Sequence, residues 1–325
     1  MFLAGDIGGT STRLSLYSKQ GQYLCIEKTD RLHSQDYPSL EAAVLAFLEG
    51  AESEIRSFCV GVPGPVRGGR VRLTNLPWDF SEESLRSALR IKKVRVVNDL
   101  YAFSHGIPHL SDSDLEILHP GGNEHSKDVF SVLAPGTGLG HSLSIRHQNT
   151  LVTLASEGGH IDFAPRDEIG ISLLRHLFTK YSRVSVERVI SGPGLLNIYE
   201  FLGTQPETRD FQIEPSVGDT LQPEDVAQAG LARSCPRATL ALDIFARALG
   251  SLSGNFVLTN LSTGGMYLAG GIPAKLVEKL KDGRLLEMYL SQGRLSGIVA
   301  DTPLIVVMNS DAGLLGAAYL AEANC

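Results

Sequence analysis

Residues 2–17 read FLAGDIGGTSTRLSLY: a short apolar run containing Asp6, a turn with Gly8 and Gly9, and an alternating run that leaves it. This pattern predicts a β-hairpin with two glycines at its tip. Because glycine has no side chain, an anion can approach the backbone N–H groups of the turn closely. Thr10 adds a hydroxyl donor, and Asp6 can hold a metal ion or its water shell. The stretch suggests a phosphate–magnesium site, although an ordinary Gly-Gly hairpin explains it equally well.

The same pattern returns at residues 129–145. An apolar run meets Gly136, Thr137 and Gly138, and an alternating run leaves the turn. A chain that uses one anion-binding turn twice indicates a duplicated domain. Two such turns facing each other across a cleft could hold the two ends of a triphosphate. Their pairing makes two unrelated hairpins the weaker interpretation.

Composition narrows the class of protein. The 325 residues suffice for two domains, and 43% hydrophobic with 20% charged residues is typical of a globular protein. The net charge of −7 and the absence of a basic patch argue against nucleic acid or an anionic membrane as a partner. No apolar run approaches the ~20 residues of a membrane span, and we expect no signal peptide. Four scattered cysteines predict a reduced, cytoplasmic protein without structural zinc.

A polar pair follows the apolar run at residues 94–97. Asn98 and Asp99 stand where this predicted strand ends and a helical pattern begins. An acid at this position is either a catalytic carboxylate or an ordinary helix N-cap. Taken alone, the residues favour the cap.

Two further acids stand beside glycines or apolar residues. Glu157 and His160 flank two glycines, so they are either structural groups or a metal pair without an evident third ligand. Glu187 lies in an apolar run, where a carboxylate is costly to bury without a partner. An ion pair with Arg188 or another basic residue is the simple explanation.

The last third of the chain adds a second kind of glycine site. The pair Gly270-Gly271 follows a short strand pattern and would let a flat ring lie against the backbone, as an adenine and ribose require. Residues 304–308 predict a buried strand, and residues 313–323 a helix of small residues. Asn309 and Asp311 between them are candidate helix caps.

Five segments now agree in order and spacing with one superfamily. They are Asp6–Arg13, Asn98–Asp99 with Ala102, Ala134–Gly140, Glu157–His160 and Gly264–Ile272. In these segments the chain resembles the sugar-kinase/actin/Hsp70 ATPases. Within that superfamily it is similar, over essentially its whole length, to the bacterial-type ATP-dependent glucokinases. It lacks the CxxGCxE-type zinc motif of the repressor/kinase relatives.

The resemblance implies an α/β fold of two ribonuclease-H-like (actin-like ATPase) domains with a cleft between them. Each would be a mixed five-stranded sheet flanked by helices. The smaller domain would comprise residues 1–108 plus 303–325, and the larger residues 109–302. Such glucokinases are typically cytoplasmic homodimers that use ATP and Mg²⁺.

The resemblance also assigns roles. Asp99 would accept the proton of the glucose 6-hydroxyl as that oxygen attacks the γ-phosphate, and a nearly ordinary pKa would suffice. The sugar would be held by Asn98, Asp99, Glu157, His160 and Glu187. The nucleotide would be held by Asp6, Gly8, Gly9, Thr10, Gly136, Thr137, Gly138, Gly270 and Gly271. Asp6 would orient magnesium through water.

Three alternatives to a glucokinase stay open at this point. One is a kinase of the same fold for another neutral hexose, such as mannose or N-acetylmannosamine. The second is a sugar sensor that binds without turnover, and the third is an actin-like filament ATPase. The sugar-ligand set would have no purpose in a filament protein.

Overall fold

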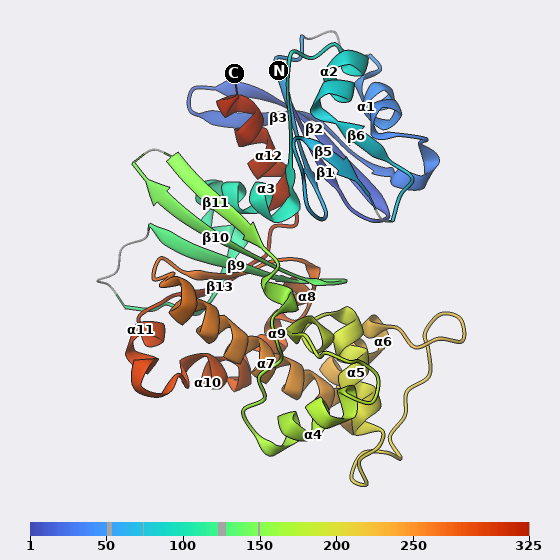
Figure 1. Ribbon diagram of the computed structural model, residues 1–325, viewed down its shortest axis with the longest axis vertical. Coiled ribbons are helices and arrows are strands. Elements are labelled where there is room, and N and C mark those ends of the chain that lie inside the picture. Colours follow the sequence, from blue (N-terminus) through green and yellow to red (C-terminus); the bar gives the residue numbers. More distant parts are fainter. Residues whose placement is uncertain (51–53, 74, 123–127, 149, 325) are drawn as a thin grey trace. The chain divides into compact units, whose positions relative to one another are not determined.

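The computed structural model describes residues 1–325 except 51–53, 74, 123–127, 149 and 325 (Figure 1). Cys325, one of the four cysteines discussed above, lies outside the described residues. The chain forms two compact units. Unit 1 comprises residues 1–111 and 309–325, and unit 2 comprises residues 112–308. Each unit has its own mixed sheet, with helices packed on it (Figure 1).

The sheet of unit 1 has five strands in the order β3-β2-β1-β4-β7. Their bounds are Tyr23–His33, Ser11–Gln20, Phe2–Ile7, Ser57–Val62 and Lys93–Asn98. Strands β1, β4 and β7 are parallel, whereas β2 and β3 extend the sheet as antiparallel neighbours. The predicted opening hairpin is confirmed as β1 and β2.

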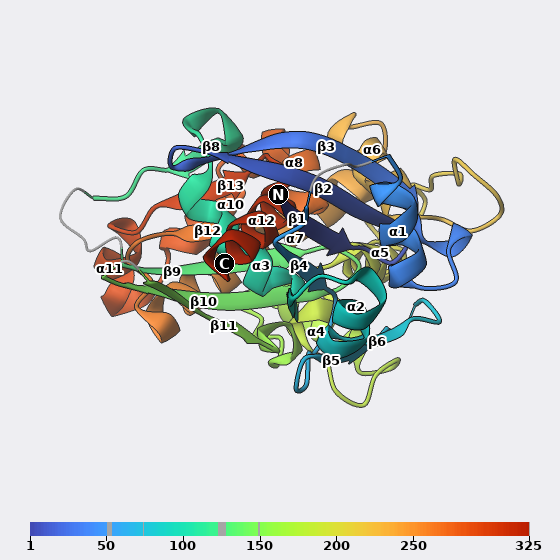
Figure 2. The ribbon, with the colours of Figure 1, turned by 90° about the horizontal axis from the view of Figure 1, so that it is seen from above.

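Helices cover both faces of this sheet because alternate residues of β1 point to opposite faces. Leu3 joins the core beneath α1, whereas Phe2 and Ala4 join the core beneath α12. Figure 1 shows α3 and α12 on one side of the sheet and α1 and α2 on the other. A two-stranded ribbon, β5 and β6, lies beside α2 (Figure 2). The bounds are Leu40–Leu48 for α1, Glu82–Leu89 for α2, Asp99–Gly106 for α3, Ala312–Ala323 for α12, Arg70–Arg72 for β5 and Asp79–Ser81 for β6.

Helices α3 and α12 meet at backbone distance. A Cβ added to Gly106 would overlap the carbonyl oxygen of Ala312, and one added to Gly316 would overlap that of Ala102. The small-residue pattern predicted for the last helix therefore has a specific use. It seats α12 against α3, the helix that begins at Asp99.

The sheet of unit 2 has six strands in the order β11-β10-β9-β12-β13-β8. Their bounds are Thr150–Ser156, Leu139–His147, Val129–Pro135, Met266–Leu268, Leu304–Val307 and Leu115–His119. The first five strands repeat the order and directions of the unit 1 sheet. This repetition supports the predicted duplication of one domain.

Two expectations about this sheet were wrong. It has six strands rather than five, because β8 pairs antiparallel with β13. The apolar residues of β8 lie within the predicted polar connection 108–128, where the surrounding Ser and Asp residues obscured them. Strand β13 was assigned to the smaller domain with residues 303–325, yet it pairs with β12. A fully buried strand needs neighbours on both edges, and unit 2 supplies them.

Helix α7, Pro236–Asn260, carries the core of unit 2. Its buried residues, such as Leu249 and Phe256, pack with apolar residues of the sheet and of α5 and α10. The other helices are α4 Glu168–Leu177, α5 Gly192–Leu202, α6 Pro223–Leu231, α8 Gly271–Lys275, α9 Val277–Leu280, α10 Arg284–Leu290 and α11 Ser296–Ala300. Short 3₁₀ turns span Ser34–Asp36, Ile107–His109, Asp112–Asp114, Gly158–His160, Val186–Arg188 and Gly293–Leu295.

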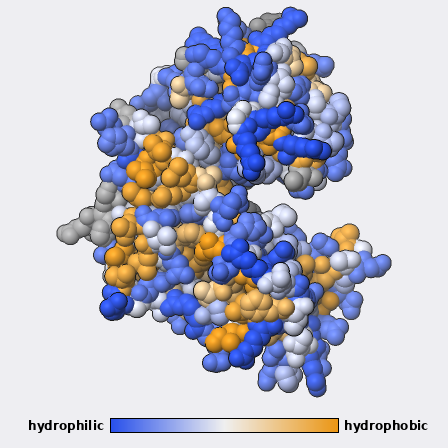
Figure 3. Space-filling model, viewed as in Figure 1, coloured by the Kyte–Doolittle hydropathy of each residue, from blue (hydrophilic) through white to orange (hydrophobic). Residues whose placement is uncertain are grey.

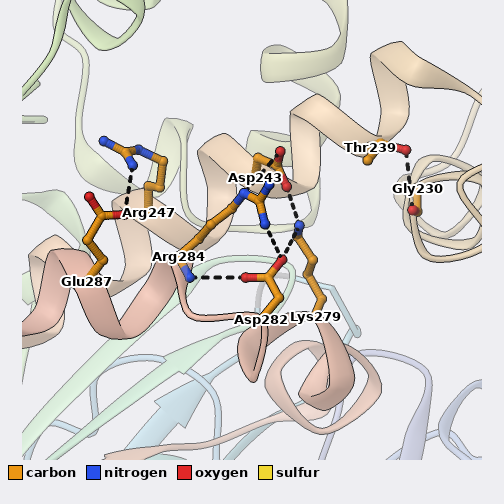
Figure 4. Close-up of polar contacts among 8 residues, drawn as sticks. All are labelled: Gly230, Thr239, Asp243, Arg247, Lys279, Asp282, Arg284 and Glu287. Atoms are coloured by element: carbon orange, nitrogen blue, oxygen red, sulfur yellow. Dashed lines mark hydrogen bonds and ion pairs between the residues drawn. The ribbon is translucent and has the colours of Figure 1, made fainter.

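An ion network fastens the α9–α10 connection to α7 (Figure 4). Lys279 pairs with Asp243 of α7 and, at 2.6 Å, with Asp282. Arg284 completes the network at 3.2 Å from Asp243 and 2.9 Å from Asp282. The Lys279 side chain is only 11% exposed and that of Asp243 17%. Lys279 and its two carboxylate partners are therefore largely shielded from water, whereas the Arg284 side chain is 45% exposed.

The surface of unit 2 includes apolar side chains among polar ones (Figure 3). Ile145 of β10 and Val152 and Leu154 of β11 are exposed. Within the described residues, no helix is long and apolar enough to span a membrane.

Candidate active site

The parallel strands of unit 1 bring two of the predicted acids to one edge of the sheet. Asp6 pairs in register with Gly61 on β4, and Val62 pairs with Asn98 at the end of β7. The carboxyl ends of β1 and β7 therefore open on the same side, where α/β proteins place their ligand sites. Asp99, the first residue of α3, lies close enough to Asp6 for the two carboxylates to interact.

Asn98, not Asp99, caps helix α3. The Asn98 side-chain oxygen accepts hydrogen bonds from the backbone N–H groups of Leu100 at 3.0 Å and Tyr101 at 3.2 Å. Its amide nitrogen donates to the Gly64 carbonyl at 3.2 Å. The Asp99 carboxylate accepts from the Leu100 backbone N–H at 2.8 Å, and hydrogen bonds from its own backbone and from the Asn98 side chain also act on it. The N-cap interpretation of Asp99 was therefore wrong, because its neighbour occupies that role.

The carboxylate of Asp99 has a perturbed affinity for protons. Burial raises the pKa of Asp99 to about 6; the Leu100 N–H bond opposes this rise, and the Asp6 carboxylate adds to it. The sequence had led us to expect a nearly ordinary pKa for Asp99. A carboxylate with this pKa is still about nine-tenths ionised at pH 7 and is a stronger base than an exposed aspartate.

Arg13 lies on β2 of the opening hairpin, and the sequence predicted no role for it. Its guanidinium pairs with Asp6 and, at 2.6 Å, with Asp311. It also donates to the Ser310 carbonyl at 2.6 Å. Asp311 stands at the N-cap position of α12 but makes no side-chain cap bond, so its predicted capping role was wrong. Arg13 instead joins the β1–β2 hairpin to the start of the last helix.

The two glycine turns close in related ways. Gly8 donates its N–H to the Ser11 carbonyl, and Gly136 donates its N–H to the Gly138 carbonyl, both at 2.8 Å. The first glycine of each turn thus uses its N–H to hold the turn rather than to bind an anion. Gly9 and Thr10 are exposed at the tip of the first turn.

Glu187 reaches the second turn. Its Oε2 accepts the Leu139 backbone N–H at 2.9 Å, and a Cβ on Gly138 would lie 2.7 Å from the same oxygen. Arg188 instead lies over the ring of Tyr181, 4.3 Å from its centroid. The ion pair expected between Glu187 and Arg188 is therefore replaced by a backbone contact with the turn.

Glu157 and His160 come to the same edge of the unit 2 sheet. Glu157 precedes and His160 ends the 3₁₀ turn Gly158–His160 that follows β11. The last residue of β11, Ser156, pairs with His141 on β10. Both side chains are exposed, and His160 Nε2 lies 4.0 Å from Glu157 Oε2. Among the described residues no group of three or more His, Cys, Asp or Glu could hold a metal ion. The metal-pair interpretation thus gains no third ligand.

A pocket of about 520 Å³ in unit 2 joins other predicted residues. Gly136, Thr137 and Gly271 line it together. Gly270 has φ of 85°, and a Cβ there would lie 3.2 Å from the Pro135 carbonyl oxygen, so glycine is required for this close turn. The pocket also has residues that the sequence reasoning missed: Ser191, Gln222, Glu224 and Lys275. The Ser-Gly-Pro-Gly run at 191–194 was the available signal for the first of them.

One carboxylate in unit 1 suits magnesium that is carried with a phosphate. Mg²⁺ keeps several waters and usually takes one or two protein carboxylates together with substrate phosphates. Asp6 is a partly buried carboxylate at a strand end beside a glycine turn, and it is held by Arg13. This donor set fits a water-mediated contact and does not form an all-protein cage.

Solved structures define the class of protein. A glucokinase from an Antarctic psychrotroph superposes with a TM-score of 0.86 at 27% identity, covering 99% of this chain and 98% of that chain. A ROK family glucokinase from Streptomyces griseus, solved with glucose and AMPPNP, shares the fold at a TM-score of 0.66 and 20% identity, covering 99% of both chains. The fold is that of the sugar kinases with two actin-like ATPase domains, as predicted.

Sequence relatives identify the family. The glucokinase family model matches residues 3–324. The glucokinase of Marinobacter nauticus is 36% identical over 317 residues, which is 97% of this chain and 95% of that protein. The glucokinase of Hahella chejuensis is 36% identical over 319 residues, with the same coverage. The chain belongs to the glucokinase family, which confirms the predicted class of enzyme, an ATP-dependent glucose kinase.

Proposed function

We propose that this protein transfers the γ-phosphate of ATP to the 6-hydroxyl of glucose, giving glucose 6-phosphate and ADP, with Asp99 as the catalytic base. The observation that carries the assignment is the relation of Asn98 to Asp99. Asn98 caps the helix, so the neighbouring Asp99 carboxylate at the strand end is not used as the cap and can turn its second oxygen to a substrate hydroxyl. Its raised pKa suits a group that takes a proton from a hydroxyl.

Sugar recognition is proposed for Asn98, Glu157, His160 and Glu187 together with Asp99. Carboxylates accept from hydroxyl groups, and the Asn98 amide can donate through its nitrogen. A site with three carboxylates repels an anionic sugar phosphate and favours a neutral hexose. It also rejects analogues that would leave its polar groups unpaired.

Nucleotide binding is proposed for the glycine turns and for the pocket of unit 2. Gly9 and Thr10, next to Gly8, would donate to the outer phosphates, and Thr137 and Gly138, next to Gly136, would approach from unit 2. The pocket beside Gly270 and Gly271 would take the adenosine, with Lys275 at its border. Magnesium held through water by Asp6 would neutralise phosphate charge. The family resemblance also supports a cytoplasmic homodimer.

The decisive experiment is a coupled assay of ADP release with glucose, mannose and N-acetylmannosamine, run with ATP, ADP and polyphosphate as donors. We expect the highest kcat/KM for glucose with ATP, a requirement for Mg²⁺, and loss of turnover in Asp99→Asn. Better turnover of another hexose would favour the alternative kinase. Sugar binding without ADP release would favour the sensor. Light scattering of the purified protein tests the dimer.

A further inference from the structure

A buried histidine underlies the loop that carries Glu157 and His160. His141 lies on β10 opposite Ser156 and is only 4% exposed. Its Nδ1 is 2.6 Å from Ser156 Oγ, and Ser156 is the residue immediately before Glu157. The imidazole is thus bonded to the N-terminal end of the loop.

The other ring nitrogen sets the tautomer. Asn260, at the end of α7, donates its amide to His141 Nε2 at 3.1 Å and also to Ser131 Oγ at 3.0 Å. Since Nε2 accepts, the proton of the neutral ring is on Nδ1, which donates to Ser156. Burial lowers the pKa of His141 to about 4, which is consistent with a neutral ring at pH 7.

The same ring forms the surface beneath the loop. His141 stacks on Phe256 of α7, with ring centroids 3.8 Å apart. A Cβ on Gly158 would lie 2.8 Å from Phe256 Cζ and 2.9 Å from His141 Cβ, and one on Gly159 would overlap the Leu139 carbonyl oxygen. Gly158 therefore lets the loop lie directly on the stacked rings of His141 and Phe256, and Gly159 lets it lie on the backbone of Leu139.

We propose that His141 is a positioning residue for sugar binding: through its bond to Ser156 and its contact with Gly158, it fixes the loop that presents Glu157 and His160 to glucose. This inference rests on the proposed sugar-binding role of these two residues. The ring itself is beneath the loop and does not touch the substrate. Its effect should therefore appear in the affinity for glucose and not in the chemical step.

The test compares His141→Phe and Ser156→Ala with the unchanged protein by steady-state kinetics and by calorimetric titration with glucose. Phenylalanine keeps a ring on Phe256 but cannot donate to Ser156. Both variants lose the bond between His141 and Ser156, and His141→Phe also loses the bond from Asn260. Loss of the shared bond should raise the KM and Kd for glucose about fivefold, with kcat and the KM for ATP nearly unchanged. The double variant should bind glucose no more weakly than His141→Phe alone, because both changes remove the same bond.

Ser144→Ala is the matched control. Ser144 is buried on the same strand, 2.9 Å from Thr153 on β11, and it faces a part of the hairpin remote from the loop. It should leave the affinity for glucose unchanged. If His141→Phe fails to fold, Ser156→Ala tests the same bond from an exposed position.

Two outcomes separate this inference from the proposed function. Normal glucose affinity in Glu157→Ala would overturn the sugar site itself. Loss of affinity in Glu157→Ala, with normal affinity in both His141→Phe and Ser156→Ala, would overturn only the positioning role. A fall in kcat with no change in glucose affinity would also overturn it.

Discussion

The carboxylate of Glu187 accepts the backbone N–H of Leu139 at 2.9 Å, so a residue assigned to the sugar holds the glycine turn assigned to the nucleotide. Glu187 and the glycine turn at residues 136–138 both belong to unit 2. This contact requires that position 138 has no side chain, since a Cβ there would lie 2.7 Å from Glu187 Oε2.

Gly138→Ala should therefore impair both substrates. The added methyl group displaces Glu187 from Leu139, and hydrogen bonds to a charged group are strong enough for about a tenfold or larger rise in KM for glucose and for ATP. Steady-state kinetics measure both constants. Gly297→Ala is the control, because nothing lies within 4 Å of a Cβ there. A rise in only one KM would show that the two sites are not joined by this contact.

Asp99→Asn should reduce kcat by at least about 10²-fold, because the amide cannot take the hydroxyl proton. Its size and polarity are close to those of aspartate, so the Kd for glucose measured by calorimetry should change little. Turnover close to that of the unchanged protein would refute the assignment of Asp99 as the base.

The raised pKa of Asp99 predicts the pH dependence of turnover. In the proposed mechanism the ionised form of Asp99 is the active base, so we expect kcat to fall as pH decreases through about 6. A pH–rate profile of kcat at saturating glucose and ATP checks this expectation. A profile that stays flat from pH 7 down to pH 5 would contradict it.

The raised pKa of Asp99 also predicts that the protein loses stability as this carboxylate ionises, although turnover increases. The pKa of Asp99 is about 6 in the folded state against an ordinary 3.8, so between these values the folded state binds more protons than the unfolded state. The contribution of Asp99 to stability is thus present below pH 4 and is lost as pH rises through about 6. Asp99→Asn should increase the free energy of unfolding at pH 7 by up to about 3 kcal/mol. Denaturant unfolding should show little gain at pH 4.

Gly316→Ala should destabilise the protein by about 1–3 kcal/mol or more, because the methyl group meets the Ala102 carbonyl oxygen where α12 packs on α3. Gly313→Ala, one turn earlier on α12, is the matched control. Its Cβ would be 3.8 Å from the nearest atom, an ordinary contact. Thermal unfolding of both variants separates the packing effect from helix propensity. Equal melting temperatures would contradict the backbone contact.

Lys279→Met should cost about 1–3 kcal/mol, because Arg284 is then the one cation of the network left to pair with both Asp243 and Asp282. Adding Asp243→Asn should restore part of the loss, since Arg284 then has a single carboxylate partner. Urea unfolding of the single and double variants measures the coupling. If the changes in the free energy of unfolding of the two single variants simply add in the double variant, the network does not act as a unit.

The sequence was sufficient for the hairpins, the helix of small residues and the residues at strand ends. Their signals are local: glycine pairs, alternation, and an acid after an apolar run. It was insufficient for strand β8 and for the placement of β13, because neither position depends on local pattern. Pairing partners decide both, and these lie in other parts of the chain: Leu115 of β8 pairs with Val307, and Met266 of β12 pairs with Leu304.

The site shows the same division. Asp6, Asp99, Glu157 and Glu187 were proposed for the site from the residue types and the family resemblance. The cap formed by Asn98, the pairing of Arg13 with Asp6 and the place of His141 beneath the loop of Glu157 and His160 were not predicted. Each depends on which atom a side chain reaches, and Arg13 reaches Asp311 across 298 residues of sequence.

By itself, the sequence determined the class of this protein: a duplicated α/β kinase with glycine turns, a carboxylate after a strand, and a family relationship carried by the order of its motifs. Only the tertiary structure decided which of those side chains form their hydrogen bonds within the protein and which can still accept one from a substrate. The physical reason is that a hydrogen bond or the burial of a charge depends on atoms brought from distant segments, whereas turn and strand preferences are set by neighbouring residues.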